Sequence, residues 1–240
     1  MRQVYEKLPL EQFFTEFLKC LVTVLKIGEK HSTVDHVLDF AAKFSVSFYN
    51  ATDNVEESSM QDTLEEMPPF LIKLFDWLFS VHYAKDQAIR FRVCQFINKL
   101  LHNLGDEASL DDNLCDKIGT NMLERLQDKV PAVRAQAVMA LQRLQDPTSA
   151  ECPIIKAYLF HLGADPSAFV RRSVLTVIGR THVTLPYILD RTRDVKDTVR
   201  RHAYLVICKL SIRSLTIKQR ERLLREGLKD RSEQININIE

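Results

Sequence analysis

Arginine pairs recur in the C-terminal third of the chain, each following an aspartate at a fixed distance. The stretch DPSAFVRRSVL spans residues 165–175 and DVKDTVRRHAYL spans 194–205, while DKVPAVRAQAV at 128–138 keeps the aspartate and the first arginine. A guanidinium binds carboxylates and phosphates through paired hydrogen bonds. The repeated pattern therefore indicates either an internal Asp–Arg network or an anion-binding surface.

The residue types that commonly carry catalysis form no recognisable site in the sequence. The seven histidines form no HExxH motif, and the chain contains no GxGxxG, GxxxxGK[ST] or GxSxG stretch. The five cysteines have no CxxC spacing, so neither a zinc site nor a disulfide framework is indicated. We therefore expect a non-enzymatic protein without a metal or cofactor, in a reducing compartment.

Charge is distributed unevenly along the chain, although the net charge is only +1. Residues 1–69 contain 6 Lys and Arg against 12 Asp and Glu, whereas residues 165–231 contain 16 against 7. No apolar run reaches the length of about 18 residues that a membrane-spanning helix needs, so we expect no membrane association. The basic C-terminal third favours an anionic partner.

Apolar residues recur at helical spacing in pairs of segments separated by short polar breaks. The 6 glycines and 8 prolines are too few for the many turns of an all-β fold. Residues 51–69 are acidic and lack periodicity, so we expect a flexible loop there. The expected helices cover about 11–27, 33–49, 70–82, 87–104, 113–126, 132–144, 169–178, 185–191, 198–211 and 217–228, with a short helix between the breaks at 145–153 and 163–168.

The second helix of each pair carries the same apolar stripe. At about 100° per residue, Val199, Ala203 and Val206 share one face, and equivalent offsets select apolar residues in the earlier pairs. The anchor of the stripe recurs at positions 89, 133, 170, 199 and 235. This spacing predicts an all-α protein, a HEAT-repeat solenoid of about five to six helical hairpins, with residues 1–235 as one domain.

The first arginine of each phrase lies at the edge of the apolar stripe, about 75° from its centre. There it can reach an aspartate of its own or of a neighbouring repeat, and each aspartate can accept backbone N–H groups near a helix start. We interpret these residues as a structural ladder. Its members are Asp128, Arg134, Asp165, Arg171, Asp194 and Arg200.

The second arginines point away from the apolar stripe. Arg172 and Arg201 lie about 175° from its centre, where packing gives them no role. Stacked repeats would align them into a basic stripe, which suits the phosphate backbone of duplex DNA. We expect them to bind DNA together with Arg193, Lys196 and Lys209. An acidic segment of a partner protein stays an alternative ligand.

Three stretches carry a resemblance to a known family, and the third is the most specific. They read IRFRVCQFINKLL at 89–101, VRAQAVMALQRLQDPTSAECPIIKAY at 133–158, and RTRDVKDTVRRHAYLVICKLSIRSLTIKQRERLLREGLKDRSEQI at 191–235. Together they resemble the N-terminal HEAT repeats of the CAP-G subunits of condensin, over most of residues 11–235.

The resemblance implies a non-catalytic subunit of the complex that compacts mitotic chromosomes. In that family the HEAT solenoid binds a kleisin subunit of the CAP-H type, and the two form a positively charged groove that holds double-stranded DNA. ATP hydrolysis belongs to the SMC subunits, which would be indirect partners. The implied location is the nucleus and the chromosomes, with the cytoplasm during part of the cell cycle.

The chain departs from the family at its last residues. The family continues through many more repeats, whereas this sequence ends as QININIE, with Asn236 at the position expected for an arginine. We expect residues 236–240 to be the atypical tail of a truncated repeat, so much of the family's binding surface would be missing. The alternative function is a HEAT-repeat scaffold that binds proteins and not DNA. In that case the acidic N-terminal third could supply the protein-binding surface.

Overall fold

The computed structural model describes residues 2–28, 31–49, 67–105, 108, 110–232 and 235. These residues form helices and no strand, which confirms the all-α prediction. The chain divides into two compact units, Met1–Arg125 and Leu126–Glu240, which we call unit 1 and unit 2. The single solenoid expected over residues 1–235 stays a prediction.

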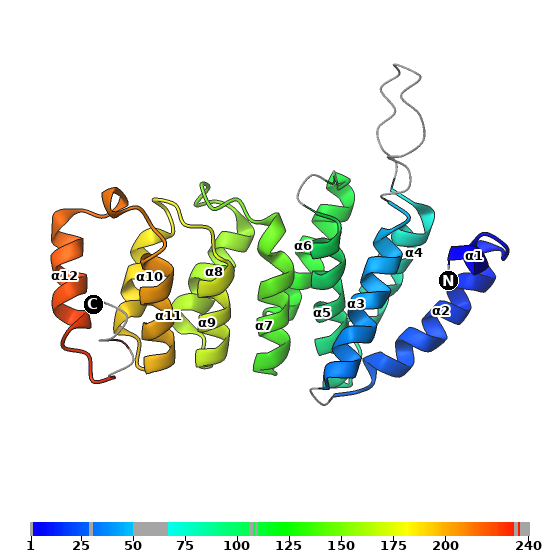
Figure 1. The fold of residues 1–240 in the computed structure, drawn as a ribbon, viewed down its shortest axis with the longest axis horizontal. Coiled ribbons are helices and arrows are strands. Elements are labelled where there is room, and N and C mark those ends of the chain that lie inside the picture. The colour runs from blue at the N-terminus through cyan, green and yellow to red at the C-terminus, as the bar shows by residue number, and fades with distance from the viewer. Residues whose placement is uncertain are drawn as a thin grey trace, which may run out of the picture. The chain divides into compact units, whose positions relative to one another are not determined.

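Unit 1 is built from paired helices that pack side by side (Figure 1). Helix α3 contacts α2 and α5, and α5 also packs against α4. Asp86 caps α5 by accepting a hydrogen bond from the Ala88 N–H at 2.8 Å. The helices of this unit are α1 (Arg2–Tyr5), α2 (Leu10–Leu25), α3 (Ser32–Val46), α4 (Pro69–Val81), α5 (Gln87–Asn103) and α6 (Asp112–Arg125).

Aromatic side chains fill the core of unit 1 near its N-terminal helices. Phe70, at the start of α4, is fully buried, and its ring lies 5.3 Å from that of Phe17 on α2 and 6.3 Å from that of Phe44 on α3. Edge-to-face contacts of this kind stabilise a core beyond the area that they bury. Aromatic residues from all three helices thus hold α2, α3 and α4 together.

Unit 1 also contains a buried ion pair. The Arg92 side chain on α5 is 2% exposed, and its Nη1 donates to Asp35 Oδ1 on α3 at 2.9 Å. Its Nε donates to the Ile27 carbonyl at 3.1 Å, just beyond the end of α2. A buried guanidinium is costly unless its donors are satisfied. Arg92 therefore ties three helices through hydrogen bonds that water does not replace.

Unit 2 repeats a helical hairpin in which the first helix is followed by a turn and the second carries the apolar stripe. The second helices, α7 (Pro131–Ala140), α9 (Ala168–Val177) and α11 (Asp197–Ile207), pack as neighbours in that order (Figure 1). Val133, Val170 and Val199, the predicted anchors, are fully buried. The remaining elements are η1 (Leu141–Leu144), α8 (Pro153–Ala164), α10 (Leu185–Asp190), η2 (Arg191–Arg193), η3 (Ile212–Ser214) and α12 (Ile217–Gly227).

The helix bounds expected from periodicity differ from the observed ones by a few residues. The largest differences are at 132–144 and 198–211. There α7 ends at Ala140 and continues as the 3₁₀ turn η1, and α11 ends at Ile207 before the 3₁₀ turn η3 at Ile212–Ser214. Most of the expected acidic loop, residues 51–66, lies outside the described residues, as do residues 236–240. Residues 67–69 belong instead to the folded unit, because Met67 is buried and Pro69 begins α4.

Replacing Arg92 with methionine tests the buried ion pair. The variant keeps the apolar stem but removes a donor from the Ile27 carbonyl and the charged donor from the half-buried Asp35, to which only Gln95 Nε2 would still donate among the contacts described. We therefore expect the free energy of unfolding to fall by about 1–3 kcal/mol. Urea unfolding followed by circular dichroism measures it. Lys19→Met is the control, since Lys19 and its partner Glu16 are both largely exposed. Equal losses in the two variants would contradict a special role for Arg92.

Candidate nucleic-acid interface

An aspartate marks the start of each repeated phrase in unit 2 and shapes the turn before the second helix. Oδ1 of Asp128, Asp165 and Asp194 accepts a hydrogen bond from the backbone N–H two residues further on, at 2.8–2.9 Å. That N–H belongs to the N-cap residue of α7, α9 or α11. The carboxylate thus fixes the turn by which the chain enters each helix.

The first arginine of each phrase bridges two successive aspartates. Nη1 of Arg134 donates to the Asp128 carbonyl at 2.8 Å, while its Nε and Nη2 donate to the two carboxylate oxygens of Asp165 at 2.8 and 2.7 Å. Arg171 repeats this geometry with the Asp165 carbonyl at 2.7 Å and the Asp194 carboxylate at 2.8 and 2.7 Å. The contacts form a ladder from turn to turn.

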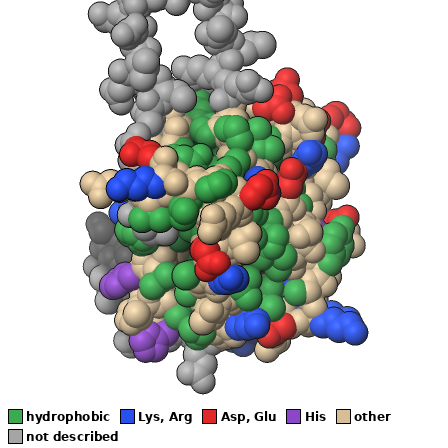
Figure 2. All heavy atoms as spheres, turned by 90° about the vertical axis from the view of Figure 1, so that its right-hand side faces the viewer, with side chains coloured by type: hydrophobic (Ala, Val, Ile, Leu, Met, Phe, Trp, Pro, Cys, Tyr) green, Lys and Arg blue, Asp and Glu red, His purple; other side chains and the backbone are tan. Residues whose placement is uncertain are grey.

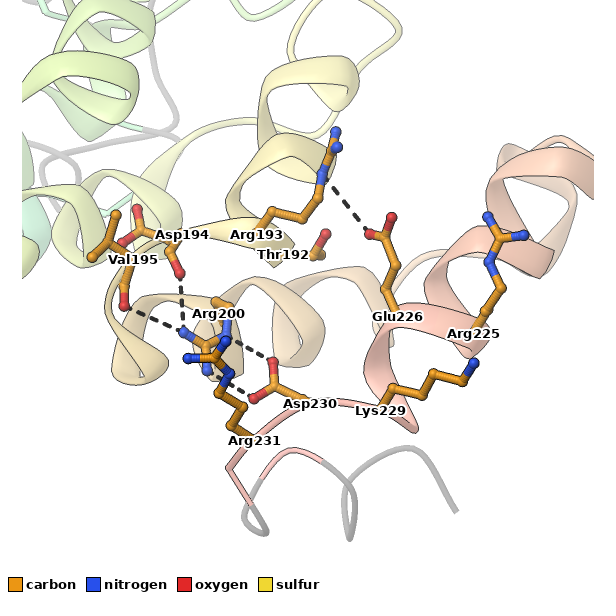
Figure 3. A pocket seen from close by; sticks show the side chains of 10 residues that line it. All are labelled: Thr192, Arg193, Asp194, Val195, Arg200, Arg225, Glu226, Lys229, Asp230 and Arg231. Carbon is orange, nitrogen blue, oxygen red and sulfur yellow. Dashed lines mark hydrogen bonds and ion pairs between the residues drawn. The ribbon is translucent and has the colours of Figure 1, made fainter.

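Arg200 continues the ladder with a residue that was not predicted. Its Nη1 donates to the Asp194 carbonyl at 3.0 Å, but its Nε and Nη2 bind the Asp230 carboxylate, both at 2.7 Å (Figure 3). Asp230 Oδ1 also accepts the Ser232 N–H at 2.9 Å, as the earlier aspartates do. A signal for Asp230 was present, because it stands six residues before position 236, the spacing of the other Asp–Arg phrases.

The carboxylates of Asp165 and Asp194 are buried, and their hydrogen bonds favour the ionised form. Burial alone would raise the pKa of Asp165, but hydrogen bonds from Arg134, the Ser167 N–H and His161 outweigh it, so this pKa lies below its ordinary value. For Asp194, burial is likewise outweighed by hydrogen bonds from Arg171 and the Lys196 N–H, and its pKa is also lowered. Each buried negative charge is thus compensated by a fixed set of donors.

The second arginines, Arg172 on α9 and Arg201 on α11, line one pocket. They are exposed and contribute to a cavity of about 210 Å³, which we call the α9–α11 pocket. The pocket is polar on most sides and has one apolar side chain, Leu205. Its other lining residues are Asp197, Thr198, His202 and Ser232. The structure therefore brings together the two arginines that helical phase selected.

His202 was not expected in this site, yet it lines the pocket. The His202 ring spans from α11 to α9, where its Nε2 lies 3.0 Å from Thr176 Oγ1. Burial, followed by the positive charges of Arg172 and Lys209, lowers the pKa of His202 below its ordinary value. Only the adjacency of His202 to Arg201 in sequence could have indicated it, because the contact with Thr176 comes from another helix.

The remaining predicted DNA-binding residues do not all share this surface. The positive charge of Lys209 lies close enough to lower the pKa of His202. Lys196 is the exposed N-cap residue of α11 and does not line the α9–α11 pocket. Arg193 ends η2, on the first-helix side of its hairpin, and its Nη2 donates to Asp190 Oδ1 at 3.2 Å. It lines a different cavity of about 780 Å³ with Glu226 (Figure 3). Arg193 is therefore separate from the Arg172 and Arg201 pocket.

Unit 1 presents an apolar surface flanked by both basic and acidic side chains (Figure 2). Figure 2 shows apolar side chains gathered over the face that carries α1 and α2. A groove of about 470 Å³ there is lined by Leu18 and Val22 of α2 and by Trp77 of α4, with Lys19 and Lys26 also at its walls. Such a surface is suited to an extended or helical segment of a protein and lacks the dense positive charge typical of a duplex site.

Neither a metal cluster nor a membrane-spanning helix occurs among the described residues. Within them, no group of three or more His, Cys, Asp or Glu side chains could hold a metal ion. In the same part of the chain, no helix has the length and apolar character needed to cross a bilayer.

The stacked hairpins of unit 2, joined by an Asp–Arg ladder, define an all-α protein of the HEAT type. No protein-family model matches the chain. It is 47% identical to condensin complex subunit 3 of Xenopus laevis across 97% of this chain and 22% of that protein. The human condensin complex subunit 3 is 44% identical across 93% of this chain and 22% of that protein.

A solved structure extends the likeness to three dimensions. The chain matches the S. pombe condensin Cnd3–Cnd2 subcomplex with a TM-score of 0.75 and 32% identity, covering 95% of this chain and 28% of that one. The likeness confirms the predicted HEAT-type fold and supports the resemblance to condensin drawn from the sequence. This chain spans about a fifth of the length of the vertebrate relatives.

Adjacent arginines on α9 should differ in their effect on stability. Arg171→Ala leaves the buried Asp194 carboxylate without two donors, so we expect the free energy of unfolding to fall by about 3 kcal/mol. Arg172→Ala is the matched control and should change it by less than about 0.5 kcal/mol, since Arg172 is exposed. Chemical unfolding of both variants measures this. If both variants lost a similar amount of stability, the structural role assigned to Arg171 would be wrong.

Acid should weaken the ladder in a defined pH range. The pKa of Asp194 in the folded state lies below its value in the unfolded state. Its contribution to the free energy of unfolding is therefore complete above the unfolded-state pKa and is lost as the pH falls through the folded-state pKa. We expect the stability difference between wild type and Asp194→Asn to be constant above about pH 5 and to shrink below about pH 4. Urea unfolding across pH tests this.

The exposed Asp190 supplies the control for that titration. Its pair with Arg193 is half-exposed on both sides, so Asp190→Asn should leave stability nearly unchanged at every pH. A difference for Asp194→Asn that does not change with pH would contradict an ionised, ladder-bound carboxylate.

Proposed function

We propose that this chain acts as a condensin subunit of the CAP-G type and binds duplex DNA through the basic face of unit 2. The observation that carries the proposal is the pairing of Arg172 and Arg201 in one pocket on adjacent second helices. Phosphate contacts need positive charge at positions that a repeat can align, and they carry no sequence information. The proposed ligand is therefore duplex DNA of any sequence.

The ladder supports this role by fixing the helices that carry the arginines. Arg171 is anchored to two turns, so the backbone that presents its neighbour Arg172 is held in place. Arg200 does the same for Arg201 on α11. A preorganised surface loses less conformational entropy on binding than a flexible one.

The proposed protein partner is a kleisin of the CAP-H type. The S. pombe structure that the chain matches is a subcomplex of Cnd3 with Cnd2, which supports a direct partner of this kind for the present chain. SMC ATPase subunits would be reached through that partner. In this proposal the chain supplies binding surfaces and no catalytic group, and it acts in the nucleus on mitotic chromosomes, with a cytoplasmic population in part of the cell cycle.

A protein-binding scaffold without DNA affinity is the second candidate. The apolar groove beside Trp77 in unit 1 favours it, because the groove offers Leu18 and Val22 to a partner segment. The two candidates differ in their ligand for unit 2. A scaffold would lose a protein partner when Arg172 and Arg201 are changed, with no DNA binding to lose.

Reversing the charge of Arg172 and Arg201 together tests the DNA proposal. We expect Arg172→Glu with Arg201→Glu to weaken binding to unrelated duplexes about equally and to flatten the salt dependence between about 50 and 200 mM, because fewer counterions are released. Fluorescence anisotropy with labelled duplexes, in the presence of a kleisin segment, measures both effects. Kleisin binding and the helical circular dichroism signal should stay unchanged.

The matched control carries the same change of charge elsewhere in unit 2. Arg180 and Arg213 are exposed and do not line the α9–α11 pocket, so Arg180→Glu with Arg213→Glu reports the effect of net charge alone. The proposal is wrong if the folded pocket variant binds duplexes as tightly as the control variant does.

A further inference from the structure

We propose that the α9–α11 pocket is a subsite for one phosphodiester group and that His202 becomes a phosphate donor there by taking up a proton. The inference rests on the proposed DNA binding and adds a third phosphate ligand to Arg172 and Arg201. The pocket has a volume of about 210 Å³, which suits a single partly hydrated phosphate group and not a longer ligand.

Thr176 links His202 to the backbone of α9. Thr176 Oγ1 lies 3.0 Å from the Arg172 carbonyl, which can only accept, and 3.0 Å from His202 Nε2. When the hydroxyl donates its one proton to the carbonyl, it accepts a hydrogen bond from Nε2–H. The proposed subsite uses this arrangement, in which the neutral ring carries its proton at Nε2 and Nδ1 keeps a lone pair.

Protonation changes what His202 offers to an anion. In the neutral ring, Nδ1 is an acceptor and repels a phosphate oxygen; in the charged ring it becomes a donor and the ring gains a positive charge. A phosphodiester is already fully ionised near neutral pH, so the proton must be held by the protein. The subsite is complete only in the protonated form.

The charged groups around His202 couple its uptake of a proton to the binding of a phosphate. Arg172 on α9 and Lys209 just beyond α11 oppose a further positive charge on the ring. Arg201 on α11 also lines the pocket, and Asp197 is the only carboxylate among the described residues that line it. Asp197 Oδ1 accepts the Thr198 N–H at 2.8 Å. A bound phosphate would offset the repulsion from the cations, so phosphate binding and proton uptake strengthen each other.

The experiment measures the affinity of the 240-residue chain for a labelled duplex of arbitrary sequence at constant salt, from about pH 8 to about pH 6. Wild type should bind more tightly as pH falls, by up to about tenfold per pH unit for one proton taken up. His202→Gln should lose most of this dependence. His182→Gln should keep it, because His182 is an exposed histidine of the same unit that does not line the pocket.

Thr176→Val provides a second variant if His202→Gln fails to fold. Without the hydroxyl, neutral His202 is free to carry its proton at Nδ1 and donate to phosphate unprotonated, so the pH dependence should become weaker than in wild type. Duplex binding that is independent of pH, or equally dependent in all variants, would overturn the role of His202 and leave the DNA proposal intact. No duplex binding at any pH would overturn both.

Discussion

The Asp–Arg ladder is the interaction on which the geometry of unit 2 depends. Asp165 accepts the N–H of the N-cap residue Ser167 and the fork of Arg134 from the preceding repeat, and Asp194 does the same with the Lys196 N–H and Arg171. The turn before a helix and the contact between repeats are therefore set by the same side chain. This couples local backbone shape to the packing of one hairpin on the next.

The ladder also explains why two consecutive arginines have different environments. A step of about 100° around a helix moves the side chain from the edge of the buried stripe to solvent. Arg171 is 9% exposed and holds two turns, whereas Arg172 is exposed and lines a pocket with Arg201. One short phrase thus supplies both the rigidity of the repeat and the charge on its surface.

Periodicity predicted the helices and the ladder arginines because both depend on local spacing. It placed Asp128, Asp165 and Asp194 at the turns, but it missed Asp230, whose phrase lacks the arginine at Asn236. Sequence proximity grouped Arg193 with Arg201, although Arg193 ends η2 and pairs with Asp190.

Two further residues were not predicted from the sequence because their roles depend on contacts between helices. His202 depends on Thr176 of α9, and Arg92 depends on Asp35 of α3, so neither could be assigned from its own helix alone. The fold class and the phase of each helix were thus accessible from sequence. The composition of the pocket required knowing which residues distant in sequence meet in space.

Position 171 requires the geometry of arginine, whereas position 172 requires only its charge. Charge-conserving variants Arg171→Lys and Arg172→Lys test this difference most directly, by parallel measurement of the free energy of unfolding and of duplex affinity. Lysine lacks the planar fork that spans a carboxylate and a carbonyl, so Arg171→Lys should lower stability by more than about 1 kcal/mol. Arg172→Lys should leave stability unchanged and keep most of the duplex affinity. Equal stability of the two variants, or a larger loss in Arg172→Lys, would contradict the account.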